Sequence, residues 1–178
     1  MQMQMAVVAY GLAVAAVIPA SGWLADRFGT RRIFMAAVVL FALGSAACAA
    51  SHTLVQLVAA RVLQGLGGAL LLPVGRLTVL RSFERSKFLE AMSFVAIPGL
   101  VGTLIGPTLG GWLVQILSWH WIFLINVPVG IIGVLATRAW MPDVRQPNLG
   151  AFDLSGFVML TVAMISLSLS IDGLGGLG

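Results

Sequence analysis

This sequence of 178 residues contains few charges and almost no cysteine. Charged residues make up 9% of the chain, against about 25% in an average soluble domain. The single cysteine, Cys48, allows no intrachain disulfide and no cysteine-based metal site. The chain also lacks a cluster of His, Asp and Glu at metal-ligand spacing and a paired nucleophile and base. These absences argue against a soluble domain, a metal centre and an enzyme.

The residues that are present are mostly apolar. Hydrophobic residues make up 60% of the chain, and the mean hydropathy is +1.04. Six apolar runs, of which only the third contains a charge, cover residues 1–25, 33–51, 54–75, 91–117, 119–137 and 154–171. Most reach the ~17 to 25 residues that cross a bilayer. We therefore predict an all-α integral membrane protein with six spans, whose immediate partner is the lipid bilayer.

The first run is a mature span rather than a secretory signal. It has no basic segment before it, it is too long, and it ends in Asp26 and Arg27 rather than in a small-residue cleavage site. The chain then divides into a partial bundle of five spans (residues 1–141), a linker (residues 142–153) and a further span (residues 154–178).

The basic residues indicate the orientation of these spans. The loops around His52 and His120 contain no Lys or Arg, whereas the alternate loops contain Arg27, Arg31, Arg32, Arg76, Arg81, Arg85, Lys87, Arg138 and Arg145. This asymmetry places the Arg-rich loops in the cytoplasm. Because the net charge of +4 is spread over these loops, it predicts topology and not a nucleic-acid surface.

The connection between the first two spans, GWLADRFGTRRIF (residues 22–34), carries an acid among cations. A positive-inside turn explains Arg31 and Arg32 but not Asp26. An acid at a helix end can pair with an arginine or accept from a neighbouring helix N-terminus, and such contacts can break and reform between two states. Two interpretations stand: a topological turn, and a cytoplasmic gate that includes Asp26.

Arg61 is the only charge inside the third apolar run. Gln64, Gly65 and Gly68 follow it at spacings of three, four and seven, so the four residues share one helix face. At ~1.5 Å per residue, Arg61 lies ~10 Å into the membrane from the outer end of the span. The guanidinium can snorkel outward from this depth, or it can face a water-filled cavity and favour the ionised form of an acidic partner. No acid of the chain is well placed to be that partner.

The fourth span has glycines on one face, Gly99, Gly102, Gly106 and Gly110. Such a stripe allows a static, close helix crossing. Pro98 and Pro107 lack amide protons, however, and should bend the span, as suits a moving wall.

Other polar residues of the spans offer weaker signals. Asn126, within WHWIFLINVPVG, either makes an interhelical hydrogen bond or faces a substrate cavity. We assign Gln64 and Gln115 to the same class of possible cavity-lining residues. The segment GLGGAL (residues 65–70) is not a phosphate-binding loop, because no strand precedes it and no lysine follows in the required position.

Four motifs together resemble the major facilitator superfamily. GWLADRFGTRR resembles its loop between the second and third spans, RVLQGLGGALL its fourth-span motif, and GLVGTLIGPTLGG the fifth-span motif of its antiporters. WHWIFLINVPVG looks like the sixth span of the fourteen-span drug:proton antiporters of the EmrB/QacA type. The resemblance covers almost the whole chain, with Thr30 standing where the family more often has a basic residue.

The resemblance implies a secondary active transporter of a bacterial inner membrane. It would work by alternating access, with proton influx driving efflux of hydrophobic or cationic drugs, and the proton gradient would replace any cofactor. Arg61 would take part in proton coupling, and Asp26, Arg27 and Arg31 would form the cytoplasmic gate. The antiporter helix would be shaped by Gly102, Gly106, Pro107, Gly110 and Gly111. A periplasmic adaptor and an outer-membrane channel are conceivable partners.

The resemblance also implies an incomplete bundle. The six runs match the family's second to seventh spans, so the first span and the second half would be missing, and the missing spans are needed for function. The alternatives are a non-transporting membrane subunit or degenerate remnant and, within transporters, a metabolite or sugar carrier. The antiporter motif at Gly106 and Pro107 argues against the last.

Overall fold

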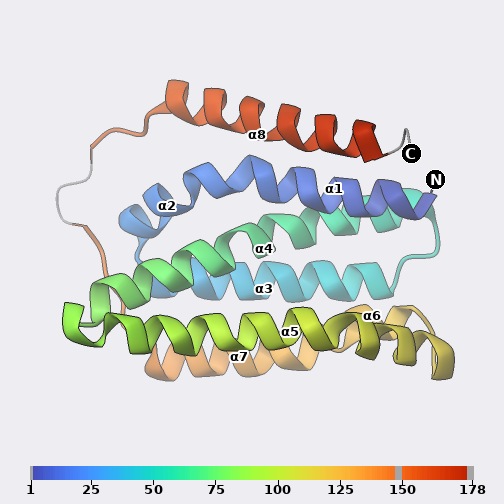
Figure 1. Cartoon of the computed structure of the whole chain (residues 1–178), viewed down its shortest axis with the longest axis horizontal. Coiled ribbons are helices and arrows are strands. Elements are labelled where there is room, and N and C mark those ends of the chain that lie inside the picture. The colour runs from blue at the N-terminus through green and yellow to red at the C-terminus, as the bar shows by residue number, and fades with distance from the viewer. Residues whose placement is uncertain (1, 147–149, 176–178) are drawn as a thin grey trace.

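The computed structural model of the chain describes residues 2–146 and 150–175, and it consists of helices and their connections (Figure 1). The main helices are α1 (Gln2–Val17), α3 (Thr30–Ala49), α4 (Leu54–Ser82), α5 (Phe88–Ile116), α7 (Asn126–Trp140) and α8 (Leu154–Gly175). Shorter helices connect them: η1 (Ile18–Ala20), α2 (Ser21–Phe28), η2 (Arg85–Lys87) and α6 (His120–Leu124). Since these described ranges contain no strand, the predicted all-α fold is confirmed.

Most of these helices are long and apolar enough to cross a membrane. In the described chain the five long candidates are Met5–Phe28, Thr30–Ala49, Leu54–Ser82, Phe88–Ile116 and His120–Trp140. A shorter apolar stretch, Leu154–Ser170, lies within α8. The six segments coincide with the six predicted apolar runs, and the chain is a multi-pass membrane protein with an incomplete helical bundle.

The third span extends further than hydropathy predicted. The apolar run stops at residue 75, but α4 continues to Ser82 and so includes Arg76 and Arg81, which the pattern of basic residues places in a loop. A helix C-terminus is favourable for cations because the helix dipole is negative there. The other end of α4 is fixed by a cap, in which Thr53 Oγ1 accepts from the backbone N–H of Gln56 at 3.2 Å. This cap fixes the residue at which the helix that carries Arg61 begins.

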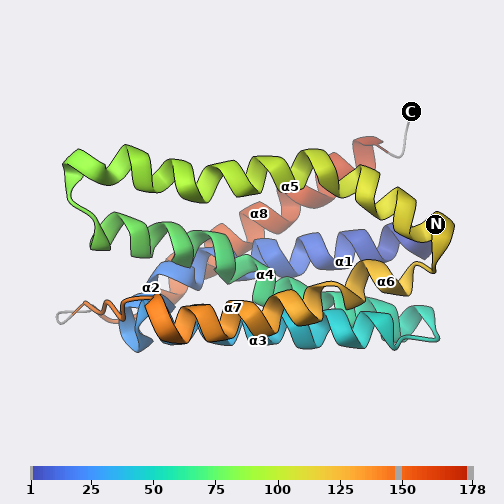
Figure 2. The same ribbon diagram turned by 90° about the horizontal axis from the view of Figure 1, so that it is seen from below.

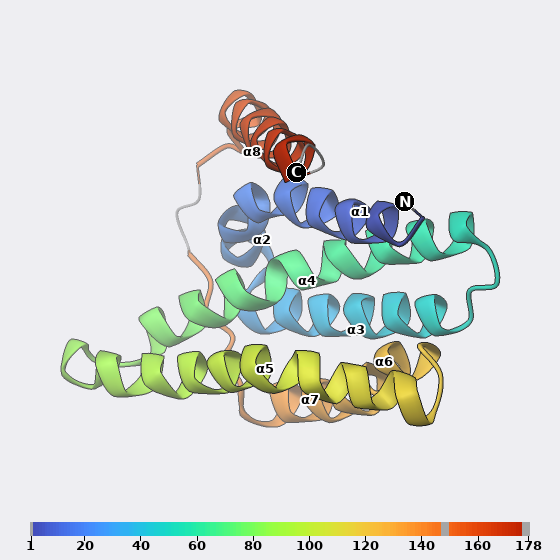
Figure 3. The ribbon, with the colours of Figure 1, turned by 45° about the vertical axis from the view of Figure 1, so that its right-hand side comes forward.

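Helix α4 packs between α1 and α3, its two most extensive neighbours (Figures 1 and 3). Glycines bring the α3 and α4 backbones together. A Cβ atom added at Gly44 would lie 2.5 Å from the backbone nitrogen of Gln64, and one added at Gly67 would lie 2.5 Å from that of Phe41. Close backbone approach through small residues is how membrane helices gain packing energy without a hydrophobic drive. The α3–α4 pair is therefore the closely packed centre of the described structure.

Gly67→Ala should destabilise this centre, because the new methyl group would overlap the Phe41 backbone. Overpacking of this kind costs ~1–3 kcal/mol. The matched control is Gly75→Ala in the same helix, where the added Cβ would make an ordinary contact of 3.5 Å with the Phe34 ring. Thermal denaturation of the purified full-length protein in detergent should give a lower midpoint for Gly67→Ala than for Gly75→Ala. Equal midpoints would contradict the close crossing.

Two helices lie at the flanks of this centre. Helix α8 packs against α1, and α5 approaches the end of α4 and α6 from the opposite side (Figures 1 and 3). No residue of α5 is buried, and its glycines have open space around them within the described chain. The helix runs continuously through Pro98 and Pro107, and its C-terminal part, drawn in yellow, turns away from the line of its first part (Figure 2). The glycine stripe is thus an uncovered face on a bent helix.

Candidate functional site

Arg61 lies half-buried on α4 and begins a chain of hydrogen bonds that crosses to α3. Its Nη1 donates to Gln64 Oε1 at 2.9 Å, and Gln64 Nε2 donates to Ser45 Oγ at 2.7 Å. Gln64 and Ser45 are 2% and 0% exposed. Because both partners are fixed by packing, they hold the guanidinium between the helices in one orientation.

Two aromatic rings complete the surroundings of this guanidinium. Its central carbon lies 5.4 Å from the ring centroid of Tyr10 on α1 and 4.9 Å from that of Phe123 on α6. A cation over an aromatic face is attracted by roughly 0.5–2 kcal/mol. We call Arg61, Gln64, Ser45, Tyr10 and Phe123 the Arg61 site. It draws on four helices, α1, α3, α4 and α6.

The Arg61 site holds a positive charge without a negative one. Among the described residues the ion pairs are Asp26 with Arg81 and Asp143 with Arg145, so no described carboxylate lies within 4 Å of Arg61. Its Nε is buried and makes no hydrogen bond within the described part of the chain. A charge inside a membrane span is costly unless it is paired or faces water. The site can therefore stabilise an anionic group that approaches it.

The glycines of the predicted α4 face give Tyr10 its position. A Cβ atom at Gly68 would lie 2.6 Å from Tyr10 Oη, and one at Gly65 would lie 2.8 Å from the Tyr10 carbonyl oxygen. Only glycine leaves this room, so α1 packs directly on the α4 face that carries Arg61 and Gln64. The four residues that the sequence placed on one face thus meet α1 and α3.

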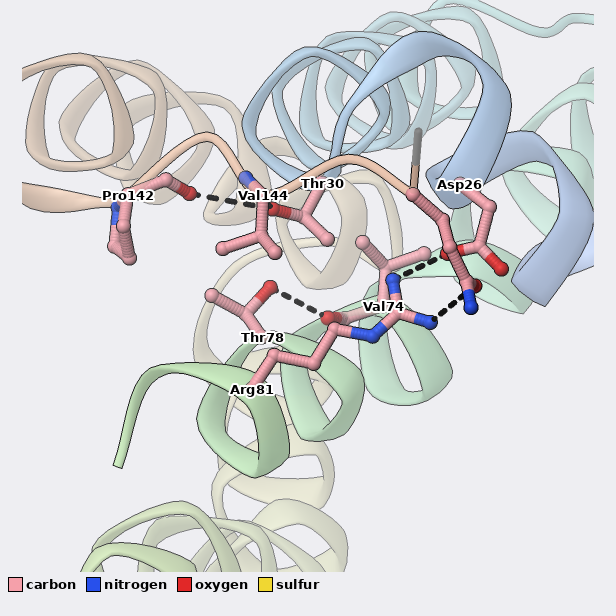
Figure 4. A network of polar contacts seen from close by, with 8 residues as sticks. Asp26, Thr30, Val74, Thr78, Arg81, Pro142 and Val144 are labelled. Carbon is pink, nitrogen blue, oxygen red and sulfur yellow. Dashed lines mark hydrogen bonds and ion pairs between the residues drawn. The ribbon is translucent and has the colours of Figure 1, made fainter. Parts of the chain in front are cut away.

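Asp26 forms an ion pair with Arg81, which joins the end of α2 to the end of α4 (Figure 4). The two side chains are 14% and 24% exposed, respectively. Partial burial weakens solvent screening, so the pair is stronger than a typical surface ion pair. Arg81 Nη2 also donates to Gln146 Oε1 at 3.4 Å. The carboxylate is paired with an arginine of another span and not with one of its own loop.

The arginines predicted for the gate lie beside this pair but outside it. Arg27 is exposed and Arg31 is half-buried, and neither belongs to an ion pair among the described residues. The Arg31 backbone N–H donates to Asp143 Oδ1 at 3.3 Å. Between them, Gly29 has a φ of +97°, a conformation that only glycine adopts without strain. This turn lets α3 start directly after α2.

The remaining predicted residues lie elsewhere. Gln115 is exposed near the end of α5, and Asn126 is half-buried at the first residue of α7. Neither makes a hydrogen bond to the Arg61 site in the described chain. On α5 no described atom outside the neighbouring backbone of the helix itself lies within 4 Å of where a Cβ would be at the predicted antiporter glycines, Gly102, Gly106, Gly110 and Gly111.

The structure brings several residues to these sites that were not predicted as site residues, namely Tyr10, Ser45, Arg81, Phe123 and Gln146. A signal existed for two of them. Tyr10 is the only tyrosine of the chain and lies within an apolar run. Arg81 is a cation near the end of a helix that lies beside the end of α2, where Asp26 lies, so charge complementarity could have suggested the pair. Ser45, Phe123 and Gln146 gave no signal, because the first two look like ordinary span residues and the third like an ordinary linker residue.

Comparisons with known proteins identify the family and the relatives of the chain. A family profile described as Major Facilitator Superfamily matches residues 1–171. The whole chain is 54% identical, over 178 residues, to a protein of Serratia proteamaculans named "Putative multidrug resistance protein MdtD", and covers 37% of it. It is 53% identical to a Yersinia pestis protein of the same name, of which it covers 38%. The chain thus spans a little over a third of the length of these relatives.

Proposed function

The chain belongs to the Major Facilitator Superfamily, and from that premise we propose that it forms part of a proton-driven drug exporter. One observation carries the proposal: the guanidinium of Arg61 lies inside a membrane span, and its partners among the described residues are all neutral. The names of the relatives, which refer to multidrug resistance, support a drug as the substrate. They do not favour a metabolite or sugar carrier, or a non-transporting subunit.

In this proposal Arg61 acts on an acid supplied by a part of the transporter outside this chain. A guanidinium a few ångströms away favours the ionised form of a carboxyl group. Protonation of that carboxyl removes its attraction to Arg61, so proton entry changes which of two conformations is favoured. Return of the proton to the cytoplasm would restore the attraction. The proton gradient supplies the energy, and no cofactor is required.

The Asp26–Arg81 pair serves as the cytoplasmic gate in the same proposal, with Arg27 and Arg31 beside it. An interhelical ion pair can stabilise one state and break in the other. Gly102, Gly106, Pro107, Gly110 and Gly111 form the antiporter helix, whose open face would pack against spans outside this chain. The transporter lies in the bacterial inner membrane with its Arg-rich loops in the cytoplasm. A periplasmic adaptor and an outer-membrane channel would continue the export path.

The test is ethidium efflux from cells that lack their major exporters. We would express the chain as given and, separately, the full-length protein that carries it, at matched membrane levels. Efflux from the full-length protein only is the expected result, because alternating access needs two opposed bundles. Lack of efflux from both, with ethidium and with a panel of other cationic and hydrophobic dyes, would contradict the proposed function.

A further inference from the structure

The chain that follows α7 lies across the connection between α2 and α3 (Figure 4). We call residues 142–146 the strap, and residues 26–31 the gate loop. The two segments are more than a hundred residues apart in sequence, yet five hydrogen bonds between them connect Pro142, Asp143, Val144 and Gln146 to Asp26, Thr30 and Arg31. Neither the apolar runs nor the family resemblance accounts for this contact.

Thr30 is the centre of the contact. It is 0% exposed, its backbone N–H donates to the Val144 carbonyl at 3.1 Å, and its hydroxyl donates to the Pro142 carbonyl at 3.2 Å. The same hydroxyl accepts from the Val144 backbone N–H at 3.1 Å. One side chain thus satisfies a donor and an acceptor of the strap. A basic residue here would bury a charge and could not accept.

The far end of the strap reaches the gate pair itself. The Gln146 backbone N–H donates to the Asp26 carbonyl oxygen at 3.5 Å, and its side-chain oxygen accepts from Arg81 Nη2 at 3.4 Å. Arg81 therefore lies between the Asp26 carboxylate and the Gln146 amide. Asp26 and Gln146 both bind the Arg81 side chain. Displacement of the strap would therefore remove one of the two described partners of Arg81.

Farther along the chain, a second contact brings the same linker to α2. The ring of Phe152 packs edge to face on Trp23, with 4.9 Å between centroids, a geometry that aromatic pairs prefer. Trp23 is one turn before Asp26 on α2. The linker is thus attached to the gate region on both sides of residues 147–149.

We propose that Thr30 and Gln146 are positioning residues for the Asp26–Arg81 gate, and that the strap determines how readily this gate opens. The inference deepens the proposed function and depends on it. With the strap seated, the Thr30 hydrogen bonds fix the gate loop and Gln146 holds Arg81 against Asp26. With the strap released, Arg81 has one partner and the gate opens at lower cost.

The experiment uses the full-length protein in everted membrane vesicles and compares Thr30→Val with Thr30→Ser. Valine keeps the shape of the side chain and removes both hydroxyl bonds, whereas serine retains them. Thr137→Val is the matched control, because Thr137 is also buried but its described hydroxyl bond stays within its own helix, to the Gly133 carbonyl at 2.7 Å.

The first readout needs no transport. Trypsin cleavage after Arg145, which is exposed and within the strap, should be about tenfold faster in Thr30→Val, the effect expected when a buried hydrogen-bonded pair is broken. Thr30→Ser and Thr137→Val should be cleaved like the unsubstituted protein. Unchanged cleavage in Thr30→Val would contradict the claim that the Thr30 hydroxyl holds the strap against the gate loop, whatever the result for transport.

The second readout is ethidium transport in a double-mutant cycle with Arg81→Gln. If Thr30 acts through the gate pair, Thr30→Val changes the export rate in the normal background and has no further effect when Arg81 is already replaced. If the effects of Thr30→Val and Arg81→Gln on the export rate multiplied, the positioning role of Thr30 would be overturned. If the unsubstituted protein exports neither ethidium nor the other dyes, the proposed function fails, and the cleavage result still decides whether the strap exists.

Discussion

Arg61→Ala should lower proton-driven ethidium export by about 100-fold while leaving membrane insertion intact. The substitution removes the only charge within the α4 apolar run together with its hydrogen bond to Gln64 and its contacts with Tyr10 and Phe123. A hydrogen bond to a charged group is worth ~1.5–3 kcal/mol, and 1.4 kcal/mol is a factor of about ten. The measurement is the initial rate of ethidium uptake into energised everted vesicles at matched protein levels.

Two further variants distinguish a specific role of Arg61 in proton coupling from a general effect of losing a positive charge. Arg76→Ala removes an exposed arginine from the same helix, and it should export normally. Arg61→Lys keeps the charge but cannot reproduce the planar guanidinium that lies between two rings and an amide, so it should recover only part of the rate. Normal, pH-dependent export by Arg61→Ala would contradict the coupling role.

Asp26→Asn should lower export by roughly tenfold or more, because it leaves Arg81 partly buried without a counter-charge. Breaking a fully buried pair from one side costs ~3–5 kcal/mol. Since these side chains are 14% and 24% exposed, solvent screening should reduce the effect to about half of that. Export rates of Asp26→Asn, Arg81→Gln and the double variant measure the pair, and the double variant should export no worse than the worse single variant.

The corresponding control is Glu84→Gln. Glu84 is an exposed acid just beyond the end of α4, and it takes part in no ion pair among the described residues. The Glu84→Gln variant should export ethidium at the rate of the unsubstituted protein. If the effects of Asp26→Asn and Arg81→Gln on the export rate multiplied in the double variant, the two residues would act independently. The hypothesis that they form the gate as a pair would then be wrong.

The fold could be predicted from the sequence because hydropathy depends on local composition alone. Each apolar run became helical, and the first and fifth runs are divided into more than one helix. The bounds were less accurate where a helix extends beyond its apolar part, as α4 does past residue 75. The predicted span 119–137 is likewise two helices, α6 and α7, since Pro128 has no N–H to bond the carbonyl four residues earlier.

The candidate sites were predictable only in part, because hydropathy does not give the register between helices. The face of α4 with Arg61 and Gln64 follows from helical spacing, but which atoms of α1, α3 and α6 face it depends on packing. Gly44, Gly65 and Gly67 decide that packing through backbone contacts, and the same glycines could equally have faced lipid. Thr30 is a second example, because a departure from the family pattern proved to be a buried residue with two hydroxyl hydrogen bonds.

The central claim is that Arg61 couples drug export to proton entry, and its most direct test is proton flux. We would reconstitute the full-length protein in liposomes that contain a pH-sensitive dye and impose a pH gradient, with and without ethidium. We expect ethidium-dependent proton movement in the unsubstituted protein and none in Arg61→Ala, although the two proteins should bind ethidium equally well. Equal proton movement in the two proteins would contradict it.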